Sequence, residues 1–557
     1  MKKLSIILVA VLGIFTFSSC EDFLDMKPTN QLASSEAINT AADAKVFMNG
    51  IMTRLSSSNL YGLNLFLYAD AKGGDLTIFS QGRGSDGLYS FNHNPNSGSY
   101  SGFWTTSYNT ILQLNNLIDN IAKLEAEGAS EDFGDMKGQA LTIRALVYFN
   151  LVKIYGLPYT QYSPTQSLGV PKVLEVLDAS ALPGRATVAE NYEHIIADLN
   201  EGAKTITKTV STSTNGYPTY WANRAIAARV YEAMGNHTEA LKAAKEVIDS
   251  KKYSLYSNED WVDSWSEQFG DESIFELQML VNENALTTGS IGAYYSRIHH
   301  YSSKVGGYFA ASDYWLERMS EDPEDIRWGV MAYDENSESY DKNEFAGKGD
   351  RLGCSYKYFG GVDMPGDGKD DCAACNVKVV RLSEMYLIAA EASLALGKAD
   401  DAAEYLNAIR KRSPSLEPAT ASTVTVEMIL NEKSKEFFQE GVRYWDRLRH
   451  GEVIEFNDEI MGIDCPHRDK VIDTKSYHKI VLPISTDELN SNPTLRTQQM
   501  FPRARHILTS STPSPLPSSR ALLLSLLLPM QNPAKASNLF APVTSAKIQR
   551  TPTPLSV

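Results

Sequence analysis

The sequence predicts an all-α fold in which pairs of helices form a scaffold and two long irregular insertions interrupt it. In several segments between residues 104 and 450, apolar residues recur at steps of three and four, the spacing of an amphipathic helix. Two of these segments share a register of small residues that lets paired helices approach closely. By contrast, residues 56–102 and 252–380 are rich in Gly, Ser, Asn, Asp and Tyr. Ordered loops of such length usually carry function.

The chain begins with a predicted lipoprotein signal peptide, residues 1–19. Two lysines precede an apolar run over residues 4–17, and two serines stand directly before Cys20. This pattern is typical of a secretory signal, and the run is shorter than the ~20 apolar residues of a spanning helix. We expect Cys20 to be the first mature residue and to carry a diacylglycerol on its thiol and an acyl chain, such as palmitate, on its amine. Several acyl chains anchor a protein stably. The alternative is ordinary secretion with an incidental Cys20.

Three helices are predicted in the first half of the chain, over residues 104–127, 137–155 and 187–204. The second stops at Gly156, with Pro158 just beyond, which are helix-ending signals. The third starts with Thr187 and has Glu190 three residues later, the pattern of a capping box. Trp104 opens the first helix and is predicted to pack in the core.

Two later segments, 221–250 and 381–411, have the register of a tetratricopeptide repeat (TPR). Each carries alanines at matching offsets around one glycine, Gly235 or Gly397, at which the chain turns between two antiparallel helices. The helices over 137–156 and 187–204 are candidates for a further pair. Residues 425–450 predict one more amphipathic helix.

Charge excludes one class of function and marks an unusual tail. The 557 residues carry a formal charge of −16, which opposes nucleic-acid binding because phosphates need basic surfaces. All 68 acidic residues lie at or before Glu488, so the seven basic residues after it leave −23 on the rest. Residues 496–557 therefore form an acid-free tail rich in Ser, Pro, Thr and Leu. It is predicted to be either a disordered extension or a frameshifted end, and the abrupt loss of acids favours the second.

Metal and catalytic motifs are weak. The CAAC string at 372–375 has no second CxxC, so the cysteines are interpreted as structural or free. A Ca²⁺ site is conceivable on the loop that holds Asp363, Asp367, Asp370 and Asp371, but EF-hand spacing is absent and a solvated acidic loop is favoured. The GxGxxG match at 82–87 lacks a following helix pattern, and no GxSxG or HExxH motif occurs. No cofactor and no catalytic residue are predicted.

Six strings occur in an order that is specific as a set, although each is weak alone. They are CEDFLDMKP at 20–28, RALVYFNLVKIYG at 144–156, AARVYEAMGN at 227–236, RLSEMYLIAAEA at 381–392, EGVRYWDRLRHG at 440–451 and LPISTDELNSNP at 482–493. Together they resemble the SusD/RagB-type lipoproteins of Bacteroidetes over about residues 20–495. There are two departures: Asn431-Glu-Lys433 replaces a common Glu-Arg pair, and the acid-free tail replaces the usual short ending.

The resemblance implies one domain, residues 20–495, with about four TPR-like helix pairs in a right-handed superhelix. It implies a binding lipoprotein, not an enzyme, on the outer-membrane surface. Such a protein captures an oligosaccharide, or in the RagB branch a peptide, and delivers it to a SusC-like TonB-dependent transporter. A TPR-type surface scaffold for protein assembly and a lipid-anchored glycosidase remain as alternatives.

Aromatic residues are the candidate ligand contacts, because pyranose C–H faces stack on aromatic rings. The candidates, drawn from the two insertions, are Tyr89, Phe91, His300, Tyr301, Tyr308 and Trp315. Ordinary packing is the alternative for each. A second set of residues lies within predicted helices and matches charged positions of the family: Arg381, Glu384, Glu391, Glu440, Arg443 and Asp446. Because partly buried charges must be paired, we expect these six to act as scaffold ties.

Overall fold

The computed structural model describes most of the chain from residue 38 to residue 499. The described ranges are 38–78, 86–96, 101–208, 216–279, 289–296, 306–332, 353–355, 357–358, 375–456, 459–460, 463–464, 469–476 and 479–499. All of them belong to the first of the two units into which the chain divides, Met1–Pro502. Cys20, the signal peptide and residues 500–557 of the tail lie outside the described residues. No described helix is both long and apolar enough to cross a membrane.

The described chain is mainly helical. Its α-helices are α2 (Ala41–Leu55), α3 (Asn64–Lys72), α4 (Asp86–Tyr89), α5 (Ser101–Ala126), α6 (Gly134–Tyr155), α7 (Val188–Thr205), α8 (Tyr220–Ala233), α9 (His237–Ser250), α10 (Ile291–Tyr295), α11 (Asp313–Met319), α12 (Leu382–Ala395), α13 (Ala399–Arg410), α14 (Val426–Glu436), α15 (Arg443–His450) and α16 (Thr486–Ser491). Short 3₁₀ helices are η3 (Asp263–Ser266), η4 (Ile326–Val330) and η6 (Pro493–Gln498). The helices predicted in the first half of the chain are confirmed as α5, α6 and α7.

Local signals set the ends of these helices as expected. The Thr187 hydroxyl accepts from the Glu190 amide at 3.2 Å, and the Glu190 carboxylate accepts from the Thr187 amide at 2.7 Å, which completes the capping box. Helix α6 ends at Gly156, whose amide donates to the Val152 carbonyl at 2.8 Å. Trp104 is buried, as predicted.

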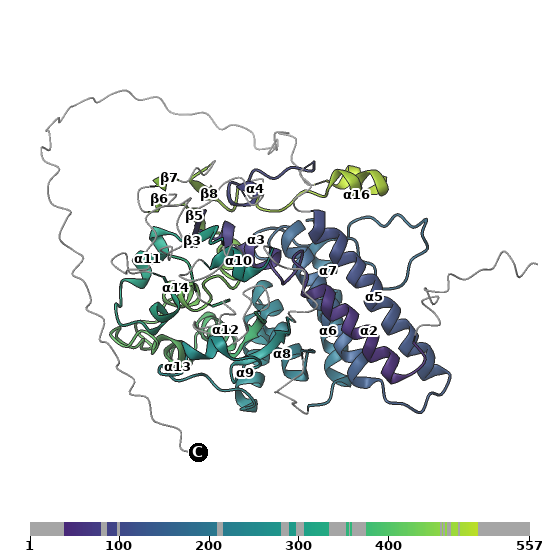
Figure 1. Cartoon of the computed structure of the whole chain (residues 1–557), viewed down its shortest axis with the longest axis horizontal. Helices are drawn as coiled ribbons and strands as arrows, with labels where there is room; N and C mark the ends of the chain where they lie inside the picture. The colour runs from purple at the N-terminus through teal and green to yellow at the C-terminus, as the bar shows by residue number, and fades with distance from the viewer. Residues whose placement is uncertain are drawn as a thin grey trace, which may run out of the picture. The chain divides into compact units, whose positions relative to one another are not determined.

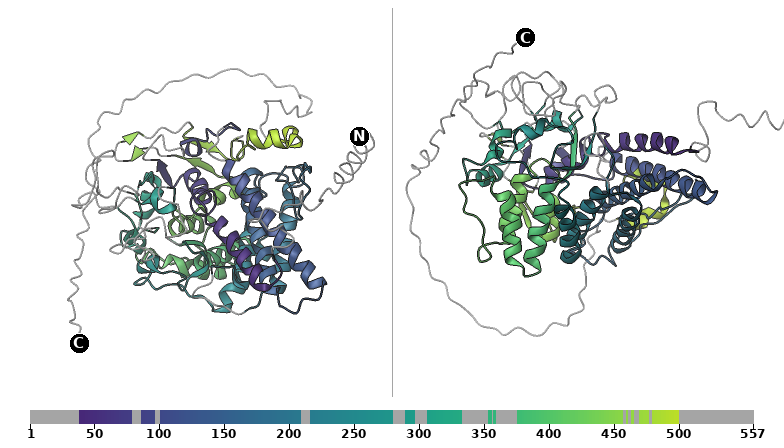
Figure 2. Two further views of the ribbon diagram at one scale, coloured as in Figure 1. Left: turned by 45° about the vertical axis from the view of Figure 1, so that its right-hand side comes forward. Right: turned by 90° about the horizontal axis from the view of Figure 1, so that it is seen from below.

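The long helices pack in chain order. Helix α5 contacts α6, α6 contacts α7, α7 contacts α8 and α8 contacts α9; α9 then contacts α12, which contacts α13 and α14. Figures 1 and 2 show α2, α5, α6 and α7 side by side, followed by α8, α9, α12 and α13. The two TPR-register segments are confirmed as α8–α9 and α12–α13, and α6–α7 is the further pair. Gly235 and Gly397 turn the chain with φ of 69° and 73°.

Close approach of α6 and α7 depends on two glycines. A Cβ at Gly202 would lie 2.9 Å from the Gly138 carbonyl oxygen, and a Cβ at Gly138 would meet Thr205 and Ile206. Real Cβ atoms do not approach backbone so closely, so these positions require glycine. The backbones of the two helices therefore come into contact where Gly138 and Gly202 face each other.

The single helix predicted over 425–450 is wrong in one respect, because the structure divides it into α14 and α15. Between them, Gln439 and Gly441 have φ of 61° and 73°, in the left-handed region that interrupts a right-handed helix. Gly441 also lies against Phe66, where a Cβ would be 2.8 Å from Cδ1 of that ring. The break positions Glu440 for the buried ion pairs described below.

Four short antiparallel ladders join segments that are far apart in the sequence. The strands are β1 (Leu76–Ile78), β2 (Ser273–Leu277), β3 (Phe309–Ala311), β4 (Val377–Arg381), β5 (Val453–Glu455), β6 (Glu459–Ile460), β7 (Ile463–Asp464) and β8 (Val471–Asp473). They pair as β1–β3, β2–β4, β5–β8 and β6–β7. The β1–β3 ladder connects the two insertions, with Leu76 opposite Ala311.

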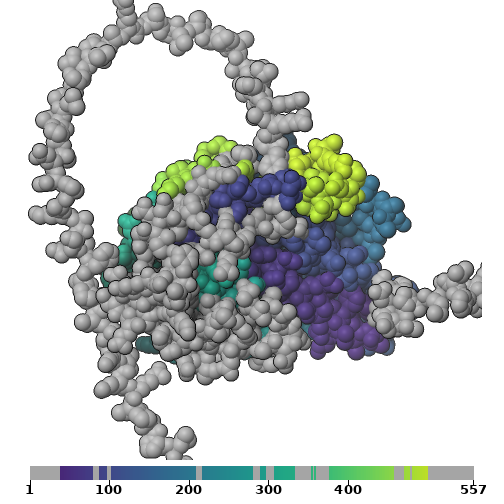
Figure 3. Space-filling model, turned by 45° about the horizontal axis from the view of Figure 1, so that its top comes forward, coloured from purple at the N-terminus to yellow at the C-terminus, as the bar shows by residue number. Residues whose placement is uncertain are grey.

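The last described residues pack against the body. Thr486 donates its amide to Pro95 at 3.0 Å, and Figure 3 shows α16 in yellow beside the early part of the chain in blue. Gln498 accepts from the Arg185 amide at 2.7 Å, and Gln499 donates to Ile484 at 2.8 Å. The predicted boundary after residue 495 is therefore too early, because the packed body continues through Gln499.

Candidate functional site

The two insertions meet at one region of the molecule, which we call the insertion face: β1, β3, α10 and α11. Besides the β1–β3 ladder, the Ile291 amide donates to Gly62 at 3.0 Å and the Ser312 amide donates to Asp75 at 2.9 Å. Segments more than 200 residues apart are thus joined by backbone hydrogen bonds. This juxtaposition agrees with the expectation that both insertions contribute to one binding face.

A buried carboxyl group holds α10 in place. Asp70, on α3, accepts from the Tyr295 hydroxyl at 2.8 Å and from the Gly441 amide at 2.9 Å. Burial raises the pKa of Asp70 well above its usual range, although both hydrogen bonds act in the opposite direction. Burial and the nearby Asp70 also raise the pKa of Tyr295. The base of the insertion face is therefore tied to the scaffold by a desolvated polar contact.

Two tyrosines lie on this base. Tyr294 and Tyr308 are half-buried, and their rings meet edge to face with centroids 4.9 Å apart. The Tyr308 amide donates to the Tyr294 carbonyl at 2.8 Å, so the backbone fixes the pair. The Tyr308 ring lies against Gly306, where an added Cβ would clash with it. Tyr314, on α11, is 39% exposed. These three rings supply the partly exposed aromatic surface of the described insertion face.

Three of the candidate ligand contacts are instead part of the core, so the prediction is wrong for them. Tyr89, Phe91 and Trp315 are each at most 1% exposed. Tyr89 and Phe91 pack edge to face on Phe456 at 5.7 and 6.0 Å, and Trp315 lies 4.0 Å from the Phe438 ring centroid. The rings that bury them come from the C-terminal third of the chain.

Of the remaining three candidate ligand contacts, one lies within the described residues and two lie outside them. Tyr308 is described and half-buried, which is consistent with a ligand contact but does not test one. His300 and Tyr301 lie outside the described residues. Tyr294 and Tyr314 are not among the predicted contacts, although both belong to the aromatic-rich segment 294–315 that also holds Tyr301, Tyr308 and Trp315. That density was the available signal, and it did not separate exposed rings from buried ones.

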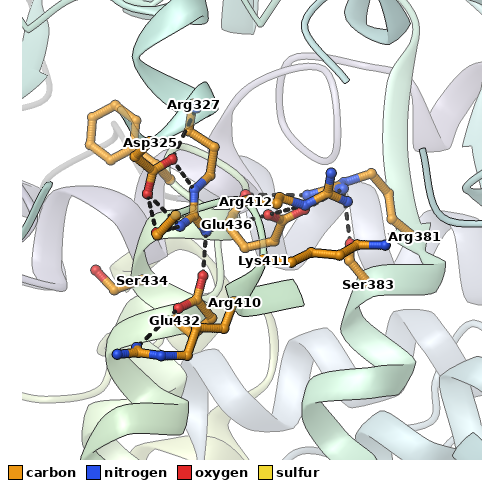
Figure 4. A network of polar contacts seen from close by, with 12 residues as sticks. Asp325, Arg327, Arg381, Ser383, Arg410, Lys411, Arg412, Glu432, Ser434 and Glu436 are labelled. Carbon is orange, nitrogen blue, oxygen red and sulfur yellow. Dashed lines mark hydrogen bonds and ion pairs between the residues drawn. The ribbon is translucent and has the colours of Figure 1, made fainter. Parts of the chain in front are cut away.

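A network of buried charges joins the end of β4, the residue before β2 and the end of α14. Arg381, at the end of β4, donates to Glu440 through Nε at 2.9 Å and pairs with Glu272 and Glu436 through Nη1 at 3.0 Å each. Figure 4 shows the neighbouring part, where Arg327 lies between Asp325 and Glu432 and Arg412 reaches Glu436. Burial would raise the pKa of Glu436, but Arg412, Arg381 and Arg327 outweigh it and lower the pKa.

A second group of ion pairs ties α8, α12, α14 and α15 together. Arg449 pairs with both carboxylate oxygens of Glu391 and with Asp446 at 2.7 Å. Lys433 contacts Asp446 at 3.2 Å and Glu232 at 2.5 Å. The six charged residues that the sequence identified as scaffold ties are all buried and paired, so that prediction is confirmed.

The structure offers little metal-binding chemistry. Within the described ranges, no group of three or more His, Cys, Asp or Glu side chains is placed to hold a metal ion. The four aspartates at 363–371 lie outside those ranges. Cys354 and Cys375 are both buried.

Two family models match the chain. The model described as "Starch-binding associating with outer membrane" matches residues 22–231, and the model described as "SusD family" matches residues 196–501. The SusD-like protein P38 of Formosa agariphila is 22% identical over 534 residues, which is 89% of this chain and 98% of that protein.

Solved structures show the same fold. A SusD superfamily protein from Bacteroides vulgatus is 31% identical with a TM-score of 0.71, covering 82% of this chain and 98% of that one. A laminarin binding SusD-like protein is 19% identical with a TM-score of 0.63, at the same two coverages. The TPR-like all-α architecture predicted from the sequence is therefore confirmed.

Proposed function

The chain belongs to the SusD family, and from this membership we propose that it captures a nutrient oligosaccharide at the cell surface and delivers it to a SusC-like TonB-dependent transporter. The proposal places the mature protein on the outer membrane, anchored through lipid on Cys20 and facing the exterior. The family description, which associates matching proteins with starch binding and the outer membrane, supports a glycan ligand and the location at that membrane. The protein acts as a binder and supplies no catalytic step.

The observation that carries the proposal is the insertion face. Backbone hydrogen bonds hold Tyr294 and Tyr308, and the neighbouring Tyr295 is tied to buried Asp70, so the two rings are positioned before a ligand arrives. A preorganised aromatic surface suits sugar rings, because little conformational entropy is lost on binding. A solved relative of the same fold is described as laminarin binding, which is in keeping with a glycan ligand.

The net charge narrows the ligand of this face. With −23 on residues up to Glu488, the field of the protein favours neutral sugars over polyanionic glycans. The same negative field equally favours basic peptides, and a peptide is the ligand that the resemblance implies for the RagB branch. A peptide-binding lipoprotein is therefore the second candidate.

Calorimetry on the mature protein with an array of oligosaccharides and peptides tests the ligand. Once a ligand is found, Tyr308→Ala should weaken it by roughly 1–3 kcal/mol, the range for stacking of a planar group on an aromatic ring. Tyr405→Ala removes a half-buried tyrosine from α13 and serves as the matched control. Equal affinities for wild type and Tyr308→Ala would place the site elsewhere, and exclusive binding of peptides would select the RagB-like function.

Membrane fractionation tests the anchor and the partner. Cys20→Ala should leave the protein without fatty acid in metabolic labelling and release it from the outer membrane. The wild-type protein should co-purify with a TonB-dependent transporter encoded beside it. A labelled Cys20→Ala protein would contradict lipidation at that residue.

A further inference from the structure

A partly open cavity of about 90 Å³ lies between α6, α8, α12 and α15. Its wall includes Phe149 and Lys153 of α6, Arg229 of α8, Glu384 of α12 and Trp445 of α15. This volume has room for several waters, or for a small ligand. Neither Tyr294 nor Tyr308 lines it, so it is separate from the insertion face.

Lys153 is the unusual group in this wall. Its ammonium nitrogen lies 4.3 Å from the Phe149 ring centroid and 4.6 Å from that of Trp445, a cation–π arrangement on two sides. Within the described part of the chain it has neither a hydrogen bond nor a carboxylate partner. A lysine in such surroundings normally has one.

The carboxylates around the cavity are already neutralised. Glu384 pairs with Arg229, and Glu440 pairs with Lys357 at 2.8 Å. The other two, Glu232 and Asp446, both contact Lys433 and Arg449. None of these acids therefore serves as the counter-ion of Lys153.

The electrostatics of Lys153 agree with this geometry. Burial is the main reason that the pKa of Lys153 is lowered to about 7, and the positive charge of Arg229 acts in the same direction. Glu384, Asp446 and Glu232 act in the opposite direction without restoring the usual value. The carboxylates of the wall thus do not compensate the ammonium fully, because each of them is already paired with another cation.

Arg229 supplies a second free donor. Its Nε and Nη2 bond to Glu384, and Nη2 also donates to the Val379 carbonyl at 2.8 Å. Those contacts leave Nη1 without a hydrogen bond to any residue that the structure describes. Two cationic groups therefore border one cavity, each with N–H donors to spare.

We propose that this cavity binds a small organic monocarboxylate, whose carboxylate bonds to Lys153 and Arg229 and whose apolar body contacts the aromatic wall. The carboxylate accepts hydrogen bonds from both cations, and charge-assisted bonds of this kind are the stronger ones in proteins. Tyr61, Phe66 and Phe149 offer the apolar contacts. This site does not depend on the glycan-binding function.

Calorimetry with benzoate and butyrate tests the proposal, with benzamide and butanol as uncharged counterparts. The mature wild-type protein should bind at least one acid more tightly than its uncharged counterpart. Lys153→Met keeps the aliphatic stem between the two rings but removes the charge, so it should weaken the acid roughly tenfold to a hundredfold, as expected for a bond to a charged group. It should leave the uncharged counterpart unchanged, which a merely unfolded or repacked variant would not do.

Proton uptake gives a second readout. Because a bound carboxylate favours the charged ammonium, binding near pH 7 should take up a fraction of a proton, measured by repeating the titration in buffers of different ionisation enthalpy. The other charged side chains that line the cavity with Lys153 are Arg229, Glu232, Glu384, Glu440, Asp446 and Arg449. Uptake should disappear in Lys153→Met and persist in Lys242→Met, the matched control on the exposed side of α9. Equal binding of acids and uncharged counterparts, no saturation by either acid, or wild-type behaviour of Lys153→Met would each overturn the proposal.

Discussion

Replacing Arg381 by Met measures how strongly the buried charge network holds the scaffold together. Arg381 is 4% exposed and contacts three carboxylates, of Glu272, Glu436 and Glu440, at 2.9–3.0 Å. These acids come from the second insertion, from the end of α14 and from the break before α15. Met is shorter than Arg but has a similar volume and neither charge nor donors, so the substitution removes the ties while keeping most of the volume.

The expected cost follows from what the three carboxylates retain. Glu272 keeps Arg412 at 2.6 Å, and Glu440 keeps Lys357 at 2.8 Å. Glu436 keeps Arg412 at 3.1 Å and Arg327 at 3.5 Å. Removing one partner from a buried pair costs about 3–5 kcal/mol, and the surviving cations place this case near the lower end. An unfolding entropy of ~2.1 cal/mol/K per residue over roughly 460 residues converts about 3 kcal/mol into a Tm decrease of about 3 °C.

Urea unfolding and calorimetry of the mature protein supply the measurement. Lys245→Met is the matched control, because Lys245 makes a close pair with Asp249 at 2.7 Å but is 51% exposed. Exposed pairs contribute only about 0–0.5 kcal/mol, so this variant should unfold almost like wild type. Arg381→Lys should fall between the two, since one ammonium cannot reproduce the planar fork of Arg381. If Arg381→Met lost no more stability than Lys245→Met, the network would not hold the scaffold as argued.

Three further predictions concern acid, a glycine and the tail. Burial alone would raise the pKa of Glu391, but Arg449 and its neighbours hold this pKa well below its usual range. The folded pKa is thus below the unfolded value of about 4.3, so ionised Glu391 stabilises the fold above that pH, and this stabilisation is lost as the pH falls below it. Glu391→Gln should therefore lose less unfolding free energy in acid than wild type. Gly441→Ala should destabilise the protein by more than ~1 kcal/mol in urea unfolding, because a Cβ there meets Phe66 and the φ of 73° disfavours alanine. Gly128 has a φ of 85° but open space around it, so Gly128→Ala should be destabilised only by the unfavourable backbone conformation. A chain that ends at Gln499 should keep the full-length Tm. A chain that ends at Leu495 loses the contacts of Gln498 with buried Arg185 and should be less stable by about 1–3 kcal/mol. Equal Tm values for the two truncated chains would contradict a packed body that extends to Gln499.

Helix positions could be predicted because their signals are local. The capping pair Thr187 and Glu190, the stop at Gly156 and the apolar stripes are read within one or two turns of chain. The break between α14 and α15 could not be predicted, because its cause lies far away in the sequence. Its residues continue the helical pattern, and the left-handed φ of Gln439 and Gly441 is imposed by contacts with the distant Phe66 and Asp70.

The candidate site was harder to predict, because aromatic density does not report burial. Tyr89 and Trp315 are covered by Phe456 and Phe438, which lie more than 100 residues away in sequence. Tyr308 belongs to the same aromatic-rich group as Trp315 but remains half-buried. Lys153 carried no signal of its own either, since a lysine on an apolar helix is usually interpreted as snorkelling to solvent. Only the arrangement of α6, α8 and α15 reveals its lack of a carboxylate.

The buried charges are better explained by positioning than by stability alone. Desolvating two ions costs several kcal/mol each, so an apolar group of similar volume can stabilise a fold equally well. An apolar cluster, however, does not specify which elements meet. The planar guanidinium of Arg381 can donate its hydrogen bonds only to elements that place carboxylates at its N–H groups. Replacing Arg381, Glu272, Glu436 and Arg412 together by apolar residues should therefore cost less stability than Arg381→Met alone. We expect faster amide exchange in residues 273–277 and 377–381 of that variant, because β2 and β4 would lose their fixed attachment to α14. Unchanged exchange there would show that the network contributes stability and not position.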